Sequence, residues 1–210
     1  MLIAFDFDGT LSDSEMMVLL GEEQGVADEI ADITERAMND EISYAESLRE
    51  RADLLFRLDE EAASRAFSRV ELRPGAADVI AALREAGHHV AVLTGGFDRG
   101  VEAALDAAGV EVDTVVANHL VSRKGHLTGR VEGPLVEGTK DTALEGLAAD
   151  LGVDMDDTVA VGDGANDLPM LEVAGLAVGY EPKPAVEPHC EVVVESMAEL
   201  SDLFEARGLL

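Results

Sequence analysis

Two aspartates, Asp6 and Asp8, stand at the end of the apolar run that opens the chain, residues 2–7, and a third carboxylate, Glu15, follows a few residues later. Carboxylates placed this close repel one another, and each resists removal from water. Such a cluster is costly unless a cation neutralises it. The start of the chain therefore indicates a site where carboxylates, a positive charge and a ligand meet.

Two further predicted strands end in polar residues or glycines. The residues that follow them are Thr94, Gly95, Gly96, Gly162, Asp163, Asn166 and Asp167. In an open parallel sheet, ligands bind beyond the carboxyl ends of the strands, so we expect these residues to meet the first aspartates in one crevice. Lys140, at the start of a predicted helix, could bring the missing positive charge.

The ligands on offer in this crevice are oxygen atoms, with no suitable cysteine or histidine. Oxygen donors select a hard cation, so the cluster indicates Mg²⁺. A magnesium site beside exposed glycine amides suits a phosphate ester. The competing interpretation is that Asp-Gly pairs are ordinary turn residues and each cluster is only a loop. The combination of the clusters favours the site over that interpretation.

Apolar stretches typical of strands alternate with helical stretches along the chain. We predict strands at 2–7, 89–93, 114–117, 158–161 and 192–194, and helices at 76–86, 99–108, 139–151 and 167–174. This alternation predicts an α/β fold with a parallel sheet covered on both faces. Residues 118–133 differ, because apolar residues flank the turn-like Arg123-Lys124-Gly125, and they predict a small β-hairpin.

Residues 14–70 interrupt the alternation with helix-period patterns and little that resembles a strand. The first strand precedes this block and the second follows it. We therefore interpret residues 14–70 as a helical cap inserted into an α/β core that consists of residues 1–13 and 71–210.

One position inside the predicted cap carries a charge on an apolar face. The residues that share this helical stripe are Leu48, Arg51, Leu55 and Leu58. Arg51 either extends out of the face to water or waits there for an anion such as a carboxylate or phosphate. The pattern by itself favours the first interpretation.

The 210 residues carry 44 acidic and 15 basic side chains, a formal net charge of −29. This charge repels nucleic acid and anionic membranes, and we expect neither as a partner. It is typical of a protein adapted to a salty cytoplasm, where salt screens the self-repulsion; the alternative is an ordinary acidic enzyme. No apolar run could span a bilayer, no secretory leader is recognisable, and Cys190 is the only cysteine, so we expect a cytoplasmic protein.

The motifs resemble those of the haloacid dehalogenase (HAD) superfamily, whose pattern is Asp-x-Asp-x-Thr, a Ser or Thr after the second strand, a Lys, and Gly-Asp-x-x-x-Asp. The matching residues are Asp6, Asp8, Thr10, Thr94, Lys140, Gly162, Asp163 and Asp167. Within that superfamily, the segments 33–51, 93–98, 127–133 and 159–180 are similar to the phosphoserine phosphatase family, with Gly9, Tyr44 and Thr94 as departures from its usual residues. The resemblance implies a Rossmann-like HAD core with a helical cap.

The resemblance also implies a mechanism. Asp6 would attack phosphorus and form an aspartyl-phosphate, while Asp8 would protonate the leaving oxygen and then accept a proton from water. The implied ligands of Mg²⁺ are Asp6, Asp163 and the main-chain carbonyl of Asp8. Asp167 would support the site, and Thr10 would orient the Asp8 loop. The groups implied to bind the phosphoryl oxygens are Thr94, Gly95, Gly96, Lys140 and Asn166.

The same resemblance assigns substrate recognition to the cap. Glu15 would pair with an ammonium and Arg51 with a carboxylate, the two ends of an amino acid, and this favours a ligand over water for Arg51. Met38 and Tyr44 would close an apolar wall. We therefore expect a Mg²⁺-dependent phosphatase, monomeric or homodimeric, that converts O-phospho-L-serine to serine and phosphate in the last step of serine biosynthesis. The alternatives are phosphoryl transfer to another hydroxyl such as that of homoserine, hydrolysis of another small phosphate ester, and a non-catalytic phospho-ligand sensor.

Overall fold

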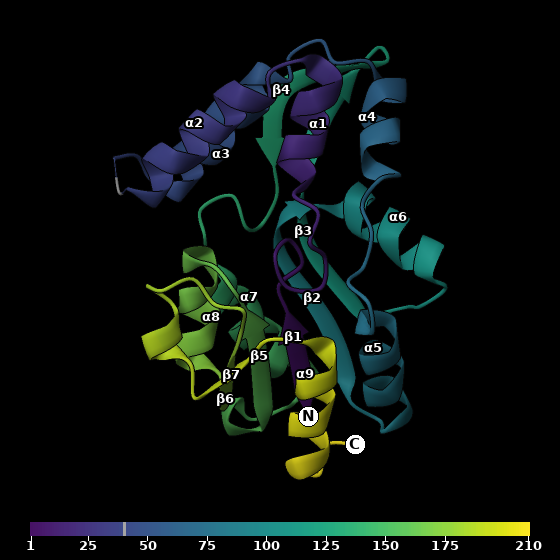
Figure 1. Cartoon of the computed structure of the whole chain (residues 1–210), viewed down its shortest axis with the longest axis vertical. Coiled ribbons are helices and arrows are strands. Elements are labelled where there is room, and N and C mark those ends of the chain that lie inside the picture. Colours follow the sequence, from purple (N-terminus) through teal and green to yellow (C-terminus); the bar gives the residue numbers. More distant parts are fainter. Residues whose placement is uncertain (40) are drawn as a thin grey trace.

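The computed structural model describes residues 1–39 and 41–210. In that part of the chain, one seven-stranded sheet has the order β4-β3-β2-β1-β5-β6-β7 (Figure 1). The strands are β1 (Leu2–Phe5), β2 (His89–Phe97), β3 (Thr114–Arg123), β4 (His126–Glu132), β5 (Thr158–Gly162), β6 (Leu176–Tyr180) and β7 (Val192–Val194). Neighbours run parallel, except that β4 is antiparallel to β3. The predicted α/β fold with a largely parallel sheet is confirmed.

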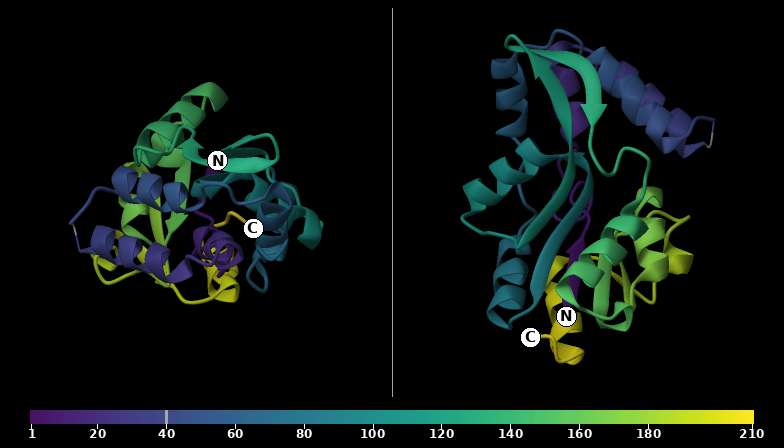
Figure 2. Two further views of the ribbon diagram at one scale, coloured as in Figure 1. Left: turned by 90° about the horizontal axis from the view of Figure 1, so that it is seen from above. Right: turned by 180° about the vertical axis from the view of Figure 1, so that it is seen from behind.

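Helices cover both faces of the sheet (Figure 2). The α-helices are α1 (Met16–Gln24), α2 (Ala27–Met38), α3 (Tyr44–Leu54), α4 (Glu60–Phe67), α5 (Ala76–Glu85), α6 (Asp98–Ala108), α7 (Lys140–Leu151), α8 (Leu168–Val173) and α9 (Met197–Ala206). Because side chains alternate along a strand, Ile3 and Phe5 of β1 pack in the core that includes α5, α6 and α9. Leu2 and Ala4 pack in a second core, with α7 and α8.

The predicted strands are present with shifted ends, and two elements were missed. The stretch predicted at 114–117 continues into the hairpin as the single strand β3, which pairs first with β2 and then with β4. The hairpin turns at Lys124 and Gly125, whose φ angles of 56° and 81° suit a two-residue turn. Strand β6 was not predicted. Like β1 and β5 it is buried along its whole length, but its short apolar sequence closely follows the helix predicted at 167–174, and periodicity does not separate a short buried strand from a buried helical segment. Helix α9 was not predicted either.

Helices α1–α4 gather beyond the carboxyl end of the sheet, and the hairpin extends upward to join them (Figure 1). The N–H of Arg57 donates to the carbonyl of Leu127 at 3.0 Å, and the N–H of Leu127 donates to the carbonyl of Leu58 at 2.8 Å. The predicted hairpin is therefore joined to the helical layer by backbone hydrogen bonds of β4. Within the described residues, no helix has the length and apolar character needed to cross a membrane.

Candidate active site

A buried lysine joins two aspartates at the carboxyl end of the sheet. Lys140, the first residue of α7, is 1% exposed, and its Nζ donates to Oδ1 of Asp6 and Oδ1 of Asp167, each at 2.5 Å. Burial alone would lower the pKa of Lys140, but the two carboxylates raise it above its ordinary value. The lysine therefore remains an ammonium in a site without bulk water.

Asp6 follows directly after β1, and its N–H donates to the carbonyl of Val161 in β5 at 2.8 Å. Burial, followed by the charge of Asp167, raises the pKa of Asp6 from 3.8 to about 8, against the opposing effect of Lys140. One lysine does not offset the burial and the repulsion in this cluster, and a further cation would lower the pKa of Asp6.

Asp6, Asp163 and Asp167 can each direct one carboxylate oxygen into a group whose members lie within 4.8 Å of one another. Asp167 is held by the N–H groups of Asp163 and Gly164, which donate to its Oδ2 at 3.0 and 2.9 Å. Burial, together with the charge of Asp167, raises the pKa of Asp163. Three buried carboxylates with oxygen atoms alone to offer fit a hard divalent cation such as Mg²⁺.

Asp8 lies beside this group with a carboxyl oxygen that has no protein partner. Its Oδ1 is buried and accepts no hydrogen bond from the described residues. Burial, then the charges of Glu15 and Asp6, raise the pKa of Asp8 well above 3.8, which suits a group that must carry a proton. Thr10 is fully buried, but its hydroxyl also lacks a partner among the described residues, so its predicted orienting role stays a prediction.

The end of β2 brings a hydroxyl and two glycines to the same place. Thr94 is 1% exposed, and its Oγ1 accepts the N–H of Gly96 at 2.9 Å. A Cβ on Gly96 would lie 3.0 Å from Oδ2 of Asp8, so the glycine permits this close approach. Asn166 follows β5, which lies on the other side of β1 from β2, and its Nδ2 donates to Oδ1 of Asp167 at 3.3 Å.

Asn118 was missed by the sequence analysis. This fully buried residue of β3 donates from Nδ2 to the carbonyl of Gly95 at 3.0 Å and accepts the N–H of Leu135 on Oδ1 at 3.0 Å. It therefore fixes the glycine end of β2 and the loop that leads to Lys140. The signal in the sequence is that Asn118 is a polar residue directly after the strand predicted at 114–117, but the predicted hairpin of residues 118–133 includes it.

Tyr44 and Arg51 of α3 approach the site from the helical layer. The hydroxyl of Tyr44 lies so close to Gly95 that a Cβ there would be 1.8 Å from it. Burial raises the pKa of Tyr44 to about 12. Burial also lowers the pKa of Arg51, against the opposing charges of Tyr44, Glu15 and Asp8. Arg51 therefore does not simply extend into bulk water, and its surroundings favour the ligand interpretation.

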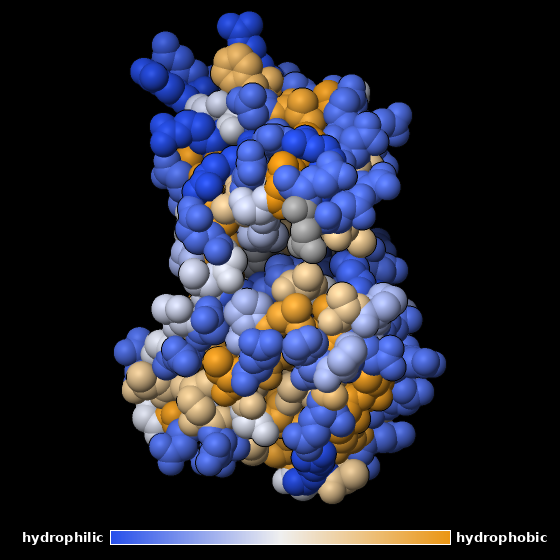
Figure 3. Space-filling view, turned by 90° about the vertical axis from the view of Figure 1, so that its left-hand side faces the viewer, coloured by the Kyte–Doolittle hydropathy of each residue, from blue (hydrophilic) through white to orange (hydrophobic). Residues whose placement is uncertain are grey.

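Met38 does not form the predicted wall in this structure. It is the last residue of α2 and is 65% exposed, whereas Ile30 is the residue of this helix that is buried. Glu15 is also exposed, at the start of α1, where a ligand could reach it. The face in Figure 3 is hollowed between its upper and lower parts, and hydrophilic residues dominate the upper part.

Comparisons with known proteins identify the family of this chain. The family model of haloacid dehalogenase-like hydrolases matches residues 3–172. A phosphoserine phosphatase of Halobacterium salinarum is 55% identical over 208 residues, which is 99% of each chain. A phosphoserine phosphatase of Methanocaldococcus jannaschii is 39% identical over 92% of each chain.

Two solved structures extend the likeness to three dimensions. A phospho-aspartyl intermediate analogue of phosphoserine phosphatase has a TM-score of 0.89 at 37% identity, covering 96% of this chain and 97% of its own. A substrate-bound phosphoserine phosphatase complex has a TM-score of 0.89 at 36% identity with the same coverage. The fold and the chain length are thus shared with these proteins almost throughout.

Proposed function

Because the chain belongs to the haloacid dehalogenase-like hydrolase family, we propose that it is a phosphatase that hydrolyses O-phospho-L-serine to serine and phosphate. The observation that carries this proposal is the cluster of Asp6, Lys140 and Asp167 beside Asp163, which combines a carboxylate nucleophile with positive charge in a buried site. The names of the relatives supply the substrate. The step would complete serine biosynthesis.

Mg²⁺ is the proposed cofactor, and Asp6, Asp163 and the main-chain carbonyl of Asp8 are its proposed ligands. When bound, the ion would neutralise charge on the transferring phosphoryl group and lower the pKa of neighbouring carboxyl groups. Asp167 supports the site by holding Lys140 and the N–H of Asp163. The oxygen-only character of this cluster is what favours magnesium over a softer metal.

Asp6 and Asp8 divide the chemistry between them. Asp6 attacks phosphorus, the ester P–O bond breaks, and the phosphoryl group becomes attached to a carboxylate oxygen. Asp8 gives its proton to the departing serine oxygen, for which the raised pKa of the buried carboxyl is suited. Asp8 then takes a proton from the water that attacks the aspartyl-phosphate, so that phosphate leaves and Asp6 is regenerated.

The phosphoryl oxygens are bound by groups from the end of β2, the start of α7 and the turn after β5. We assign this role to Thr94, Gly95, Gly96, Lys140 and Asn166. Lys140 is held in place by two carboxylates, so its charge costs little further ordering during the reaction. The hydroxyl of Thr94 is likewise held in place, because its Oγ1 accepts the N–H of Gly96.

The serine part of the substrate is recognised from the helical layer, which we propose is a cap of residues 14–70. Glu15 binds the substrate ammonium and Arg51 its carboxylate. Both lie close to Asp8. The charge of Glu15 raises the pKa of Asp8, and the charge of Asp8 opposes the lowering of the Arg51 pKa by burial. Tyr44 closes the pocket above Gly95.

The test measures phosphate release from phosphoserine, phosphothreonine and a sugar phosphate, with Mg²⁺ in molar KCl. Arg51→Ala is compared with Arg36→Ala, which removes the same charge from an ion pair between α2 and α3. We expect a preference for phosphoserine that Arg51→Ala abolishes and Arg36→Ala leaves intact. Equal turnover of all three esters would refute the substrate assignment, and no turnover of any would favour a phospho-ligand sensor. Adding homoserine and analysing products separates hydrolysis from phosphoryl transfer.

We further propose that the enzyme works in the cytoplasm as a monomer or homodimer. Its single cysteine, Cys190, and its net charge of −29 support a reducing and salty interior.

A further inference from the structure

Arg73 is a largely buried arginine between α4 and α5, on the segment that returns from the helical layer to the sheet. Its N–H donates to the carbonyl of Leu11 at 2.8 Å, so the segment lies against the outgoing chain. The guanidinium contacts two other segments. Nη2 donates to the carbonyl of Gly9 at 3.1 Å, and Nη1 lies 2.9 Å from Oε2 of Glu181.

The first of these segments is the loop that carries Asp8. Gly9 has φ of +91°, and its N–H donates to the carbonyl of Ser12 at 2.8 Å. In a trans peptide, the carbonyl of Asp8 points away from that N–H, so this hydrogen bond sets the direction of the Asp8 carbonyl. The bond from Arg73 holds the next peptide unit, that of the Gly9 carbonyl. Gly9 also packs on Asp163, because a Cβ on Gly9 would lie 2.6 Å from Oδ1 of that carboxylate.

The second segment follows β6 and also contacts Asp163. Its residue Lys183 donates its N–H to the carbonyl of Asp163 at 2.9 Å, and its Nζ lies 3.2 Å from Oδ2 of Asp163. Glu181, two residues earlier, has a left-handed φ of +41°. Arg73 holds that residue by the ion pair and stacks 4.9 Å above the ring of Tyr180.

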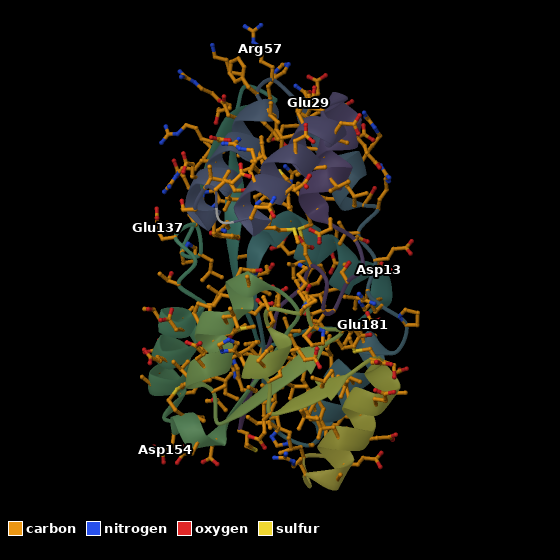
Figure 4. All side chains as sticks on the ribbon, turned by 60° about the vertical axis from the view of Figure 1, so that its left-hand side comes forward. Asp13, Glu29, Arg57, Glu137, Asp154 and Glu181 are labelled. Carbon is orange, nitrogen blue, oxygen red and sulfur yellow. The ribbon has the colours of Figure 1, made fainter. Side chains whose placement is uncertain are left out.

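Arg73 thus bridges the two segments that contact Asp163, which are the loop that carries Asp8 and the segment after β6. Figure 4 shows Glu181 on the side of the molecule where Asp13, near the outgoing segment, also lies, at the junction of the helical layer and the sheet. We propose that Arg73 is a positioning residue that sets the Asp163 carboxylate and the Asp8 carbonyl for the divalent cation. This inference rests on the metal site of the proposed function, but it concerns binding of the ion and not the identity of the substrate.

The test is calorimetric titration of Mg²⁺ into the metal-free protein in molar KCl. Arg73→Met removes both guanidinium contacts, and Arg73→Lys keeps a charge that can satisfy only one of them. The control is Arg84→Met, because the Arg84 guanidinium also makes two contacts, with Glu111 and Asp113 of the loop before β3, but at the opposite end of the sheet. We expect Arg73→Met to weaken Mg²⁺ binding by about tenfold or more, Arg73→Lys to lie between it and the wild type, and Arg84→Met to bind as the wild type does.

A second readout separates positioning from simple stabilisation. Each arginine variant should lower the melting temperature, but at saturating Mg²⁺ only Arg73→Met should lower kcat, with little change in KM for phosphoserine. Unchanged Mg²⁺ affinity in Arg73→Met, with a melting temperature lowered as in Arg84→Met, would overturn the inference. Should Arg73→Met not fold, unchanged affinity in Arg73→Lys would do the same. A wild type that binds Mg²⁺ but does not hydrolyse phosphoserine refutes the proposed substrate, and the titration of the variants still decides the role of Arg73.

Discussion

The contact between Tyr44 and Gly95 gives a prediction that can be worked out from the structure. Gly95→Ala would place a Cβ 1.8 Å from the Tyr44 hydroxyl, 3.0 Å from Cζ and 3.8 Å from Cε2. The φ of Gly95 lies outside the left-handed region, so alanine meets no backbone strain there and the effect comes from the side chain. Either Tyr44 moves out of the pocket or the end of β2 shifts.

Overpacking of this kind costs about 1–3 kcal/mol. If the seated position of Tyr44 is needed in the transition state, kcat/KM for phosphoserine should fall by about 5- to 150-fold. Tyr44→Phe removes the clashing oxygen and leaves Cζ as the nearest atom, at 3.0 Å, which a movement of a few tenths of an ångström relieves. The double variant should therefore be more active than Gly95→Ala, with a coupling energy of about 1 kcal/mol or more.

The assay is a double-mutant cycle on kcat/KM, with unfolding curves for each variant. Gly146→Ala is the control, because this glycine of α7 has no atom near its missing Cβ and alanine favours a helix. Losses that multiply in the double variant would refute the reasoning. They would mean that Gly95→Ala acts by displacing its own amide from the phosphoryl group and not through Tyr44.

Three further predictions concern the charges and the missed residue. The folded pKa of Asp6, about 8, exceeds its unfolded value of 3.8, so its contribution to stability is full below pH ~4 and is lost as pH rises to about 8. In urea unfolding, the free energy of unfolding of the metal-free wild type should therefore fall over this pH range relative to that of Asp6→Asn. Added Mg²⁺ should reduce this fall. Because the net charge is −29, the protein should unfold at a lower temperature in dilute buffer than in 1 M KCl, where the Debye length is about 3 Å and the self-repulsion is screened. Equal melting temperatures by circular dichroism in both buffers would contradict the salt-adapted interpretation. Asn118→Leu leaves the carbonyl of Gly95 and the N–H of Leu135 without their partner, at a cost of about 1–3 kcal/mol each. We expect it to lower both the stability in urea and kcat. A loss of stability with unchanged kcat would mean that Asn118 supports the fold and does not position the site.

The sequence by itself determined the alternation of strands and helices and the residues of the core site. Both are local properties: apolar periodicity is readable within a few residues, and the carboxylates follow strands whose ends share an edge by topology. Asp6 and Asp163 follow different strands, yet their meeting followed from that rule. Strand β6 was missed because it closely follows the helix predicted at 167–174, and periodicity does not separate a short buried strand from a buried helical segment.

The tertiary structure alone decided the contacts that depend on how separate layers meet. The exposure of Met38, the approach of Tyr44 to Gly95 and the bridge made by Arg73 each join segments whose relative position no local pattern encodes. Arg51 illustrates the difference, because its stripe by itself favoured an arginine that extends to water over one that waits for a ligand. The choice depended on the charges that α1 and the β1 loop bring to it, and those are set by packing across the whole chain.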